Sequence, residues 1–227
     1  MAKADLMRNH IACTFKKLLQ TNSYSGVTVQ DIANEADISR KTFYYHFFNK
    51  SDLVKYIFRA DLANELKRLF PTDELVCDTG LREDKYRYYP FFTRDYFGEH
   101  DKKAFFNVFS RYIGKNSDYY QKLFRCEDWN YLENYLIEIY RPRLKKIIAS
   151  FFAEYKVEAP AEIVDYLASY YAHSTVLWVL HRHVTKQRHY SEETKDYLGN
   201  LFYDNIHNSV EIQARRLLEE QGRKFPE

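Results

Sequence analysis

Three adjacent side chains near the start of the chain, Arg40, Lys41 and Thr42, have the chemistry to read the edges of DNA bases. Arginine and lysine donate hydrogen bonds to O6 and N7 of guanine, and the threonine methyl group can contact the methyl group of thymine. The alternative is that the basic pair belongs to an ordinary solvated turn. The surrounding segment, residues 27–52 (VTVQDIANEADISRKTFYYHFFNKSD), distinguishes the two interpretations.

This segment has the pattern of two short helices, a tight turn between them and the start of a third helix. Thr28 and Ser39 are suited to be N-caps, and Asp31 occupies the capping-box position after Thr28. Asp37 falls where the chain must reverse, and aspartate tolerates the left-handed conformation better than most residues. Asn49 can cap the third helix. The pattern is that of a helix-turn-helix, in which the start of the second helix meets the base edges.

The apolar residues of the segment are spaced so that each helix buries one side. We expect the buried set to be Val29, Ile32, Ala33, Ala36, Ile38, Phe43 and Phe47. The solvent side of the second helix then consists of Arg40, Lys41, Thr42, Tyr44 and Tyr45. We expect His46 to be packed against the core rather than to contact a ligand.

The segment resembles the DNA-binding domain of the tetracycline-repressor (TetR/AcrR) family of bacterial transcriptional regulators. The matching residues are Thr28, Asp31, Ile32, Ala33, Ala36, Ile38, Ser39, Thr42, Phe43, Tyr44, Phe47, Lys50 and Leu53. Asp37 departs from the family, which usually has glycine in the turn, and Phe48 stands where a polar residue or proline is usual. Beyond Leu53 the resemblance is one of architecture.

The resemblance implies a set of DNA-contacting residues. They are Thr28, Ser39, Arg40, Lys41, Thr42, Tyr44, Tyr45 and Lys50. At the family positions that match Thr28, Tyr44 and Lys50 the side chains hold backbone phosphates, and the position of Tyr45 contacts either a phosphate or a base.

The resemblance also implies partners and a mechanism. These are a homodimer, a near-palindromic operator in double-stranded DNA, and a repressor that a small-molecule effector releases. Some relatives of this architecture act as co-activators, so the alternative is a helical adaptor that works through a protein partner rather than by binding DNA alone. The basic pair Arg40–Lys41 and Lys50 argue against the adaptor, because a head that does not bind DNA has no need of them.

Composition favours a helical protein with a basic N-terminal part. The 227 residues include only six glycines and five prolines, and 45% are hydrophobic. Residues 1–50 contain seven Lys or Arg and four Asp or Glu, a net charge of +3, whereas the whole chain has a net charge of +2. A basic head on a nearly neutral body fits DNA contact at one end.

The same composition bears on location and on chemistry. The chain has no apolar run long enough for a membrane span and no signal-peptide pattern at residues 1–14. Cys13, Cys77 and Cys126 are odd in number and widely spaced, which indicates reduced thiols, and we expect Cys13 to lie in the core. We therefore expect a cytoplasmic protein that does not enter membranes.

Helical periodicity also continues after residue 52, so we predict an all-α fold without strands. The expected helices lie at about residues 4–21, 50–70, 73–77, 102–114, 129–155, 160–186 and from 191 onward. Pro142 should break or kink the helix at 129–155. We assign residues 1–52 to a helix-turn-helix DNA-binding domain and residues 53–227 to a helical regulatory domain that binds a ligand and dimerises.

Two long stripes of residues mark the last two helices. The first contains Ile163, Leu167, Tyr170, Ser174, Leu177, His181 and Val184, and the second contains Leu198, Leu201, Phe202, Ile212 and Leu217. In the family the corresponding helices pair with those of a second copy as a four-helix bundle. The stripes fit that pairing and fit internal packing equally well.

The chain contains 21 Tyr and 17 Phe, and most follow residue 80. Core packing explains most of them, yet ligand pockets between helices are also lined by such side chains. For a small apolar or aromatic effector, the predicted pocket residues are Tyr89, Phe92, Phe109, Tyr112, Trp129, Tyr170 and Trp178.

Other chemistry finds little support in the sequence. His173 and His181 share a helical face near His183, but no acid or cysteine joins them at a metal-binding spacing, so we predict neither a metal nor another cofactor. There is no nucleophile elbow, no glycine-rich phosphate loop and no His-Glu-x-x-His motif, so we predict that the protein is not an enzyme.

Overall fold

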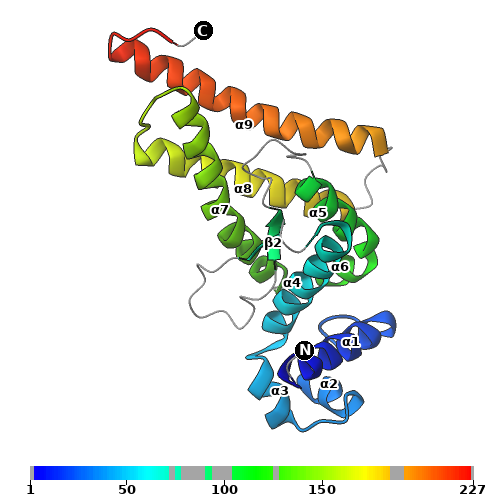
Figure 1. Ribbon diagram of the computed structural model, residues 1–227. Helices are drawn as coiled ribbons and strands as arrows, with labels where there is room; N and C mark the ends of the chain where they lie inside the picture. The colour runs from blue at the N-terminus through cyan, green and yellow to red at the C-terminus, as the bar shows by residue number, and fades with distance from the viewer. Residues whose placement is uncertain are drawn as a thin grey trace.

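The computed structural model describes residues 3–71, 75–77, 90–93, 104–124, 128–184 and 192–225. In these ranges the chain forms nine α-helices and one two-stranded ribbon (Figure 1). The predicted all-α class, with an N-terminal helix-turn-helix and a C-terminal helical part, is confirmed.

The first three helices form a small head at one end of the molecule (Figure 1). They are α1 (Lys3–Thr21), α2 (Val29–Glu35) and α3 (Arg40–His46). The predicted capping box is present, because Thr28 Oγ1 accepts the N–H of Asp31 and the Asp31 carboxylate accepts the N–H of Thr28. Ser39 caps α3 as expected, and Asp37 in the turn has a left-handed φ of 52°.

An apolar core joins the three helices of the head. Its fully buried members include Ile11, Phe15, Ile32, Phe43 and Phe47. Helix α1 contributes Ile11 and Phe15, four residues apart on one face. Cys13 lies two residues from each of them and is exposed, so the expectation that it belongs to the core is wrong. Its position about half a turn round the helix places it on the opposite face.

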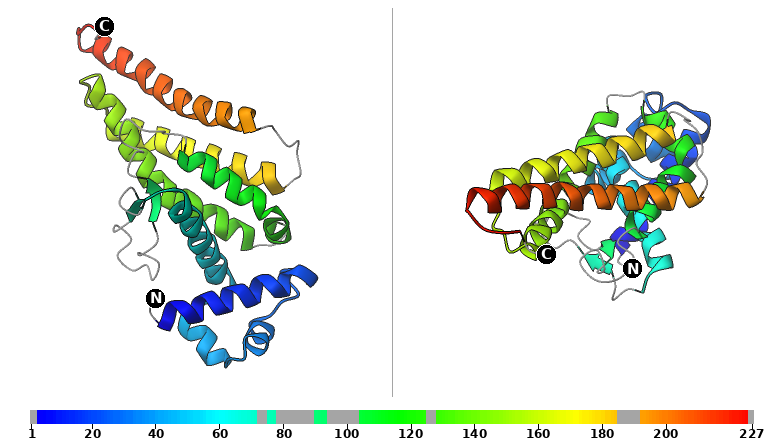
Figure 2. Two further views of the ribbon diagram at one scale, coloured as in Figure 1. Left: turned by 45° about the vertical axis from the view of Figure 1, so that its right-hand side comes forward. Right: turned by 90° about the horizontal axis from the view of Figure 1, so that it is seen from above.

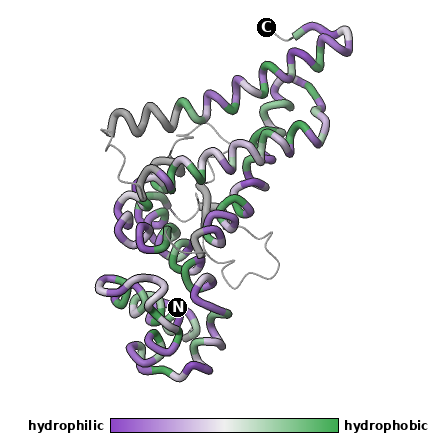
Figure 3. The backbone as a smooth tube through the Cα atoms, turned by 180° about the vertical axis from the view of Figure 1, so that it is seen from behind, coloured by the Kyte–Doolittle hydropathy of each residue, from purple (hydrophilic) through white to green (hydrophobic). Residues whose placement is uncertain are grey.

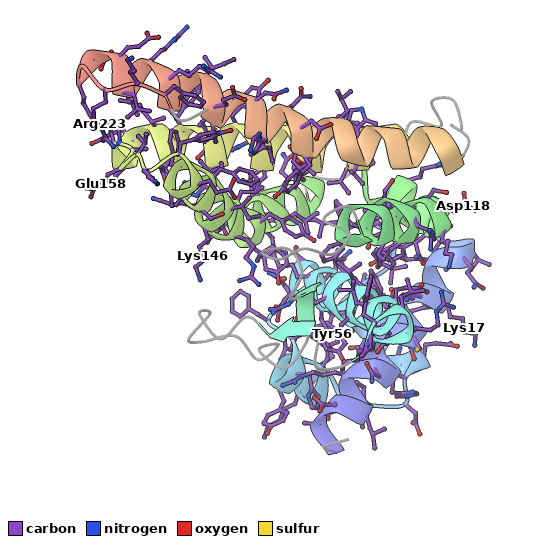
Figure 4. All side chains as sticks on the ribbon, turned by 45° about the horizontal axis from the view of Figure 1, so that its top comes forward. Lys17, Tyr56, Asp118, Lys146, Glu158 and Arg223 are labelled. Carbon is purple, nitrogen blue, oxygen red and sulfur yellow. The ribbon has the colours of Figure 1, made fainter. Side chains whose placement is uncertain are left out.

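Helix α4 (Lys50–Leu69) leads out of the head and is buried around most of its circumference. Asn49 caps it as predicted, accepting the N–H of Asp52 at 2.8 Å. The buried residues include the predicted Leu53, Ile57, Ala60 and Leu66, and also Val54, Tyr56, Phe58, Arg59, Leu62 and Ala63. Tyr56, labelled in Figure 4, donates a hydrogen bond to Asn9 of α1 at 2.6 Å. Such burial marks α4 as the central helix of the molecule.

A short antiparallel ribbon corrects the prediction that the chain lacks strands. Strand β1 (Leu75–Cys77) pairs with β2 (Pro90–Thr93), with Val76 opposite Phe92. Residues 73–77 had been expected to form a short helix. No alternation marks this ribbon in the sequence, because strands of three and four residues are too short to show a period and their pairing is not local.

Five further helices complete the body. They are α5 (Ala104–Lys115), α6 (Ser117–Phe124), α7 (Asp128–Glu154), α8 (Ala161–Val184) and α9 (Glu192–Glu220). Pro142 does not break α7, which continues through it. Both Pro142 and Glu138, whose carbonyl loses its usual N–H partner, lie on the exposed side of α7. Water can satisfy that carbonyl, which explains why the helix persists.

Helices α8 and α9 lie at the end of the molecule away from the head (Figures 1 and 2). Their buried faces contain Val164, Leu167, Ala168, Tyr171, Ala172, Val176, Val179 and Leu180 on α8, and Ile206, Val210, Ala214 and Leu218 on α9. The Tyr171 hydroxyl joins the two helices by donating to the carbonyl oxygen of Asn205 at 2.8 Å.

The predicted stripes of these two helices fall largely on the other side. Tyr170 and Leu177 of α8 are exposed, as are Leu201 and Ile212 of α9. Hydrophobic residues therefore occur on both the buried and the exposed faces of these helices. Figure 3 shows hydrophobic and hydrophilic residues interspersed along the coloured parts of both. Periodicity alone cannot say which of two apolar faces packs inside the same chain. The sequence therefore fitted internal packing of the stripes and their pairing with a second copy equally well.

Candidate nucleic-acid interface

Helix α3 presents its polar residues to solvent at the tip of the head, opposite α9 (Figure 1). Arg40 and Lys41 are exposed, Tyr44 is 48% exposed and Tyr45 is 77% exposed. Thr42 is half-buried, and its hydroxyl lies 2.9 Å from that of Ser39. The structure thus gathers five predicted DNA-contacting residues and the N-cap Ser39 on one short helix.

Two phenylalanines on the opposite side fasten α3 to the head. Phe43 and Phe47 are fully buried, with ring centroids 5.8 Å apart, and Phe47 also packs against Tyr56 of α4 at 5.3 Å. His46 is buried as expected, and its ring meets that of Tyr45 edge-on. Burial of these large side chains fixes the orientation of α3. Because α3 is already ordered, binding a ligand to its exposed face carries little entropic cost of ordering.

Arg40 and Tyr44 form a local pair on the exposed face. The guanidinium carbon of Arg40 lies 5.8 Å from the centre of the Tyr44 ring, within the range of a cation–π contact. An arginine held beside an aromatic ring can still donate its N–H groups to a base or a phosphate.

Thr28 is exposed at the start of α2, but its hydroxyl is already engaged. Thr28 Oγ1 donates to the Asp31 carboxylate at 2.6 Å, and the Thr28 N–H donates to the same oxygen at 2.8 Å. These two bonds lower the pKa of Asp31, so the cap is complete at neutral pH and is lost as the pH falls through that lowered pKa. A phosphate can take the Thr28 proton only in competition with Asp31.

Lys50 has a structural role that the sequence did not reveal. Its ammonium donates to the carbonyl oxygens of Tyr24 at 2.9 Å and Val27 at 2.7 Å, and it lies 4.3 Å from the centre of the Tyr24 ring. Lys50 therefore ties the start of α4 to the loop between α1 and α2. Backbone carbonyls leave no mark in a sequence, so no signal could have identified this contact. The phosphate contact stays a prediction.

Phe48 adds an exposed aromatic ring directly after α3. Its side chain is 82% exposed, while its N–H donates to the Asp52 carboxylate at 3.0 Å. The sequence marks Phe48 only as a departure from the family pattern, and the structure shows that its ring is exposed, as is that of Tyr45.

The four predicted effector residues whose side chains the structure describes are not gathered around one cavity. Phe109 and Tyr112 are buried and pack edge-on against Phe58 at 6.0 and 5.9 Å. Tyr170 and Trp178 are exposed on α8. Tyr89 and the side chains of Phe92 and Trp129 lie outside the described residues.

A different part of the body is hollowed. An open hollow of about 470 Å³ lies at the turn from α7 to α8. Its lining residues are Ala149, Phe152, Ala153, Lys156, Val157, Glu158, Ala159 and Val164. None of the four predicted effector residues whose side chains the structure describes lines it, so the effector site stays a prediction.

Within the described residues, no three His, Cys, Asp or Glu side chains come together in a way that could hold a metal ion. Of the helices in those ranges, none is both long and apolar enough to cross a membrane.

The capped α2–turn–α3 unit, with its polar second helix exposed, defines a helix-turn-helix transcriptional regulator. Comparison with known proteins gives the family. Residues 16–57 match the family described as "Bacterial regulatory proteins, tetR family", and residues 101–204 match "Transcriptional regulator C-terminal region". The chain belongs to the TetR family of transcriptional regulators.

Individual relatives share parts of the sequence and the fold. The chain is 31% identical over 138 residues to the HTH-type dhaKLM operon transcriptional activator DhaS of Lactococcus lactis subsp. lactis (strain IL1403), an alignment that covers 61% of this chain. The aligned region spans only 59% of that relative. A solved structure titled dihydroxyacetone kinase operon activator DhaS covers 91% of this chain and 97% of its own, with a TM-score of 0.57 and 20% identity. This second match shows likeness of fold.

The double role of Lys50 leads to a prediction about stability. Replacing Lys50 by Met should lower the free energy of unfolding by about 1–3 kcal/mol, because two loop carbonyls lose a charged donor. Lys41→Met, an identical change at an exposed position nine residues away, should alter it by less than about 0.5 kcal/mol. Urea unfolding followed by circular dichroism measures both. Equal midpoints for the two variants would show that the Lys50 contacts do not hold the head together.

Proposed function

We propose that the protein is a homodimeric, sequence-specific DNA-binding regulator that places two copies of α3 in successive major grooves of a near-palindromic operator. The observation that carries the proposal is the exposed face of Arg40, Lys41, Tyr44 and Tyr45 on a helix locked from behind. Buried Phe43 and Phe47 keep that face in one orientation, as direct readout of bases requires.

The second apolar faces of α8 and α9 support the dimer. Tyr166, Tyr170 and Leu177 lie at helical spacing on α8 and are 69%, 55% and 36% exposed. On α9, Leu201 and Ile212 are three turns apart, on the same face, and are 41% and 51% exposed. Full burial of such side chains stabilises by about 1.5–3 kcal/mol each, which favours covering them.

A two-fold axis along this surface would let the same residues pair with themselves. Isologous contact of this kind is the usual way in which a homodimer buries a self-complementary patch. The head lies at the opposite end of the molecule, so both copies of α3 remain available to DNA (Figure 2). The proposal thus assigns DNA binding and dimerisation to different ends, with residues 1–52 and 53–227 as the corresponding domains.

The sign of regulation has two candidates. The resemblance of residues 27–52 to the family favours a repressor that a small apolar or aromatic effector releases from DNA. A tenfold loss of DNA affinity then needs about 1.4 kcal/mol of coupling between effector binding and DNA binding. Activation is favoured by the relative, because it is named an activator of the dhaKLM operon. Deleting the gene separates the two, since transcription of the target rises if the protein represses it and falls if it activates it.

Selection from random duplexes tests DNA recognition. We expect enrichment of an inverted repeat whose half-site centres are one helical turn, about 10 base pairs, or a multiple of it apart. Arg40→Ala should cost about 1–3 kcal/mol on the selected sequence and relax the preference at one position of each half-site, because it removes a donor to a base. Lys145→Ala on α7, which loses the same charge far from the head, serves as the control. Enrichment of no repeat would contradict the proposal.

Light scattering tests the dimer. The unmodified protein should have about twice the 27.4 kDa mass of one chain at micromolar concentration. Ile212→Glu should shift it to the mass of one chain with the helix content retained, because a carboxylate in the paired face would be desolvated without a partner. Leu6→Glu on α1, a similar change at a residue 54% exposed, should leave the dimer intact. A monomeric unmodified protein, or an Ile212→Glu dimer, would refute the pairing.

A further inference from the structure

The C-terminal end of α1 lacks a cation of its own. Its last turn, Leu18–Thr21, contains no basic residue. The final carbonyl groups of an α-helix have no partners within the helix and carry a partial negative charge, so a nearby cation stabilises them. The backbone N–H and the side-chain amide of Asn22 both donate hydrogen bonds to the carbonyl oxygen of Leu18. The carbonyls that follow need a donor from elsewhere.

Lys122 supplies that donor from the body. It lies in the last turn of α6, and its ammonium donates to the carbonyl oxygens of Leu19, Gln20 and Asn22. The last two contacts are 3.0 and 3.3 Å long. A residue of the body thus caps a helix of the head. In Figure 4 the start of α6, marked by Asp118, and the later part of α1, marked by Lys17, lie on the same side of the molecule.

Helix α6 is itself firmly held in the body. Tyr120 is fully buried, and its hydroxyl lies 2.7 Å from that of Tyr112 on α5. Burial raises the pKa of both tyrosines well above the usual value, so this pair stays neutral. At the end of α6, the ring of Phe124 packs edge-on against His181 of α8 at 5.1 Å. Lys122 therefore projects from a fixed support.

A second bridge connects the head to the same support. Lys16 of α1 forms an ion pair with Asp61 of α4. The Tyr112 hydroxyl reaches the same Asp61 oxygen at 3.5 Å, which links the pair to α5 and, through Tyr120, to α6. Helix α1 is thus attached at Lys16 and again at its C-terminal end. Together with the hydrogen bond from Tyr56 to Asn9, these contacts attach α1 at several points along its length and restrict its rotation.

We propose that Lys122 is a positioning residue for DNA binding, which sets the angle of the head against the body and thereby the separation of the two α3 helices. The inference rests on the proposed function, since separation matters only when two heads bind one operator. The carbonyl groups that Lys122 contacts belong to the C-terminal end of α1 and the residue after it, and α3 is a separate helix, so Lys122 contributes to spacing and not to the reading of either half-site.

A spacing series on the selected operator tests this inference. Duplexes with one or two base pairs inserted or removed between the half-sites are compared with a single half-site. The unmodified protein should show a sharp optimum. Lys122→Met should bind the best spacing about tenfold more weakly and should show a flattened preference, because the loss of charged hydrogen bonds loosens the head. Its affinity for the half-site and its salt dependence should not change.

Two control variants complete the experiment. Lys122→Arg keeps the charge and the donors and should restore the sharp optimum. Lys145→Met removes the same charge from the surface of α7, where Lys145 pairs with Asp165 at 2.8 Å, and should behave as the unmodified protein. It therefore shows any effect of net charge alone on DNA affinity.

The outcomes separate the inference from the proposed function. Failure of the unmodified protein to prefer any spacing overturns both. A sharp optimum retained by Lys122→Met overturns the inference alone, as does an equal loss of affinity for half-site and full operator, which would mean that Lys122 only stabilises the head. If Lys122→Met does not fold, Lys122→Gln, which retains N–H donors without charge, takes its place. If that variant does not fold either, Lys122 determines the fold rather than the spacing, and the inference is overturned.

Discussion

Burial of α4 on nearly all sides is the constraint on which the rest of the structure depends. Its first turns pack against the head through Leu53 and Tyr56, and its later turns lie against the body through Phe58 and Leu66. Apolar side chains that recur around most of a helix must be covered on several sides, so the head and the helices of the body both have to pack around α4. The two ends of the molecule therefore share one continuous rod, and a rotation of either end strains contacts of the other.

Polar contacts fix the angles at which the helices held together by apolar packing meet. Hydrophobic packing is not directional, whereas hydrogen bonds and ion pairs fix particular angles. The head uses them where helices begin or end: Ser39 at α3, Lys50 between α4 and the loop before α2, and Lys122 at the end of α1. Each contact satisfies backbone groups that a helix terminus or loop would otherwise leave unpaired. Apolar burial thus holds the helices together, while these few side chains set how they meet.

The helix-turn-helix could be predicted from sequence because its determinants are local. Thr28, Ser39 and Asn49 each cap a helix within three residues, and Asp37 takes the left-handed turn by its own side-chain chemistry. Phe43 and Phe47 follow from spacing alone. Once Phe43 and Phe47 are placed in the core, the polar side chains of α3 must lie on its solvent-facing side.

What depends on distant partners could not be predicted. The ribbon of β1 and β2 is too short to show a period, and the carbonyl contacts of Lys50 and Lys122 involve atoms that every residue has. On α8 and α9 the sequence offers two apolar faces, and only packing against the other helices of the body, chiefly α7, selects the one that contains Val176 and Val210. The missing N–H of Pro142 predicts a break or kink, but only the fold shows that this side of α7 faces water.

The separation of roles on α3 has an evolutionary consequence. Arg40, Lys41 and Tyr45 are exposed, and the helix is held by Ser39 and the buried Phe43 and Phe47. Substitutions at exposed positions usually change stability by less than about 0.5 kcal/mol, a small part of what a folded domain has in reserve. Mutations could therefore retarget the protein to new DNA sequences one residue at a time, with each intermediate still folded. A gene duplicate that starts from this scaffold can diverge in the sites it recognises long before its architecture has to change.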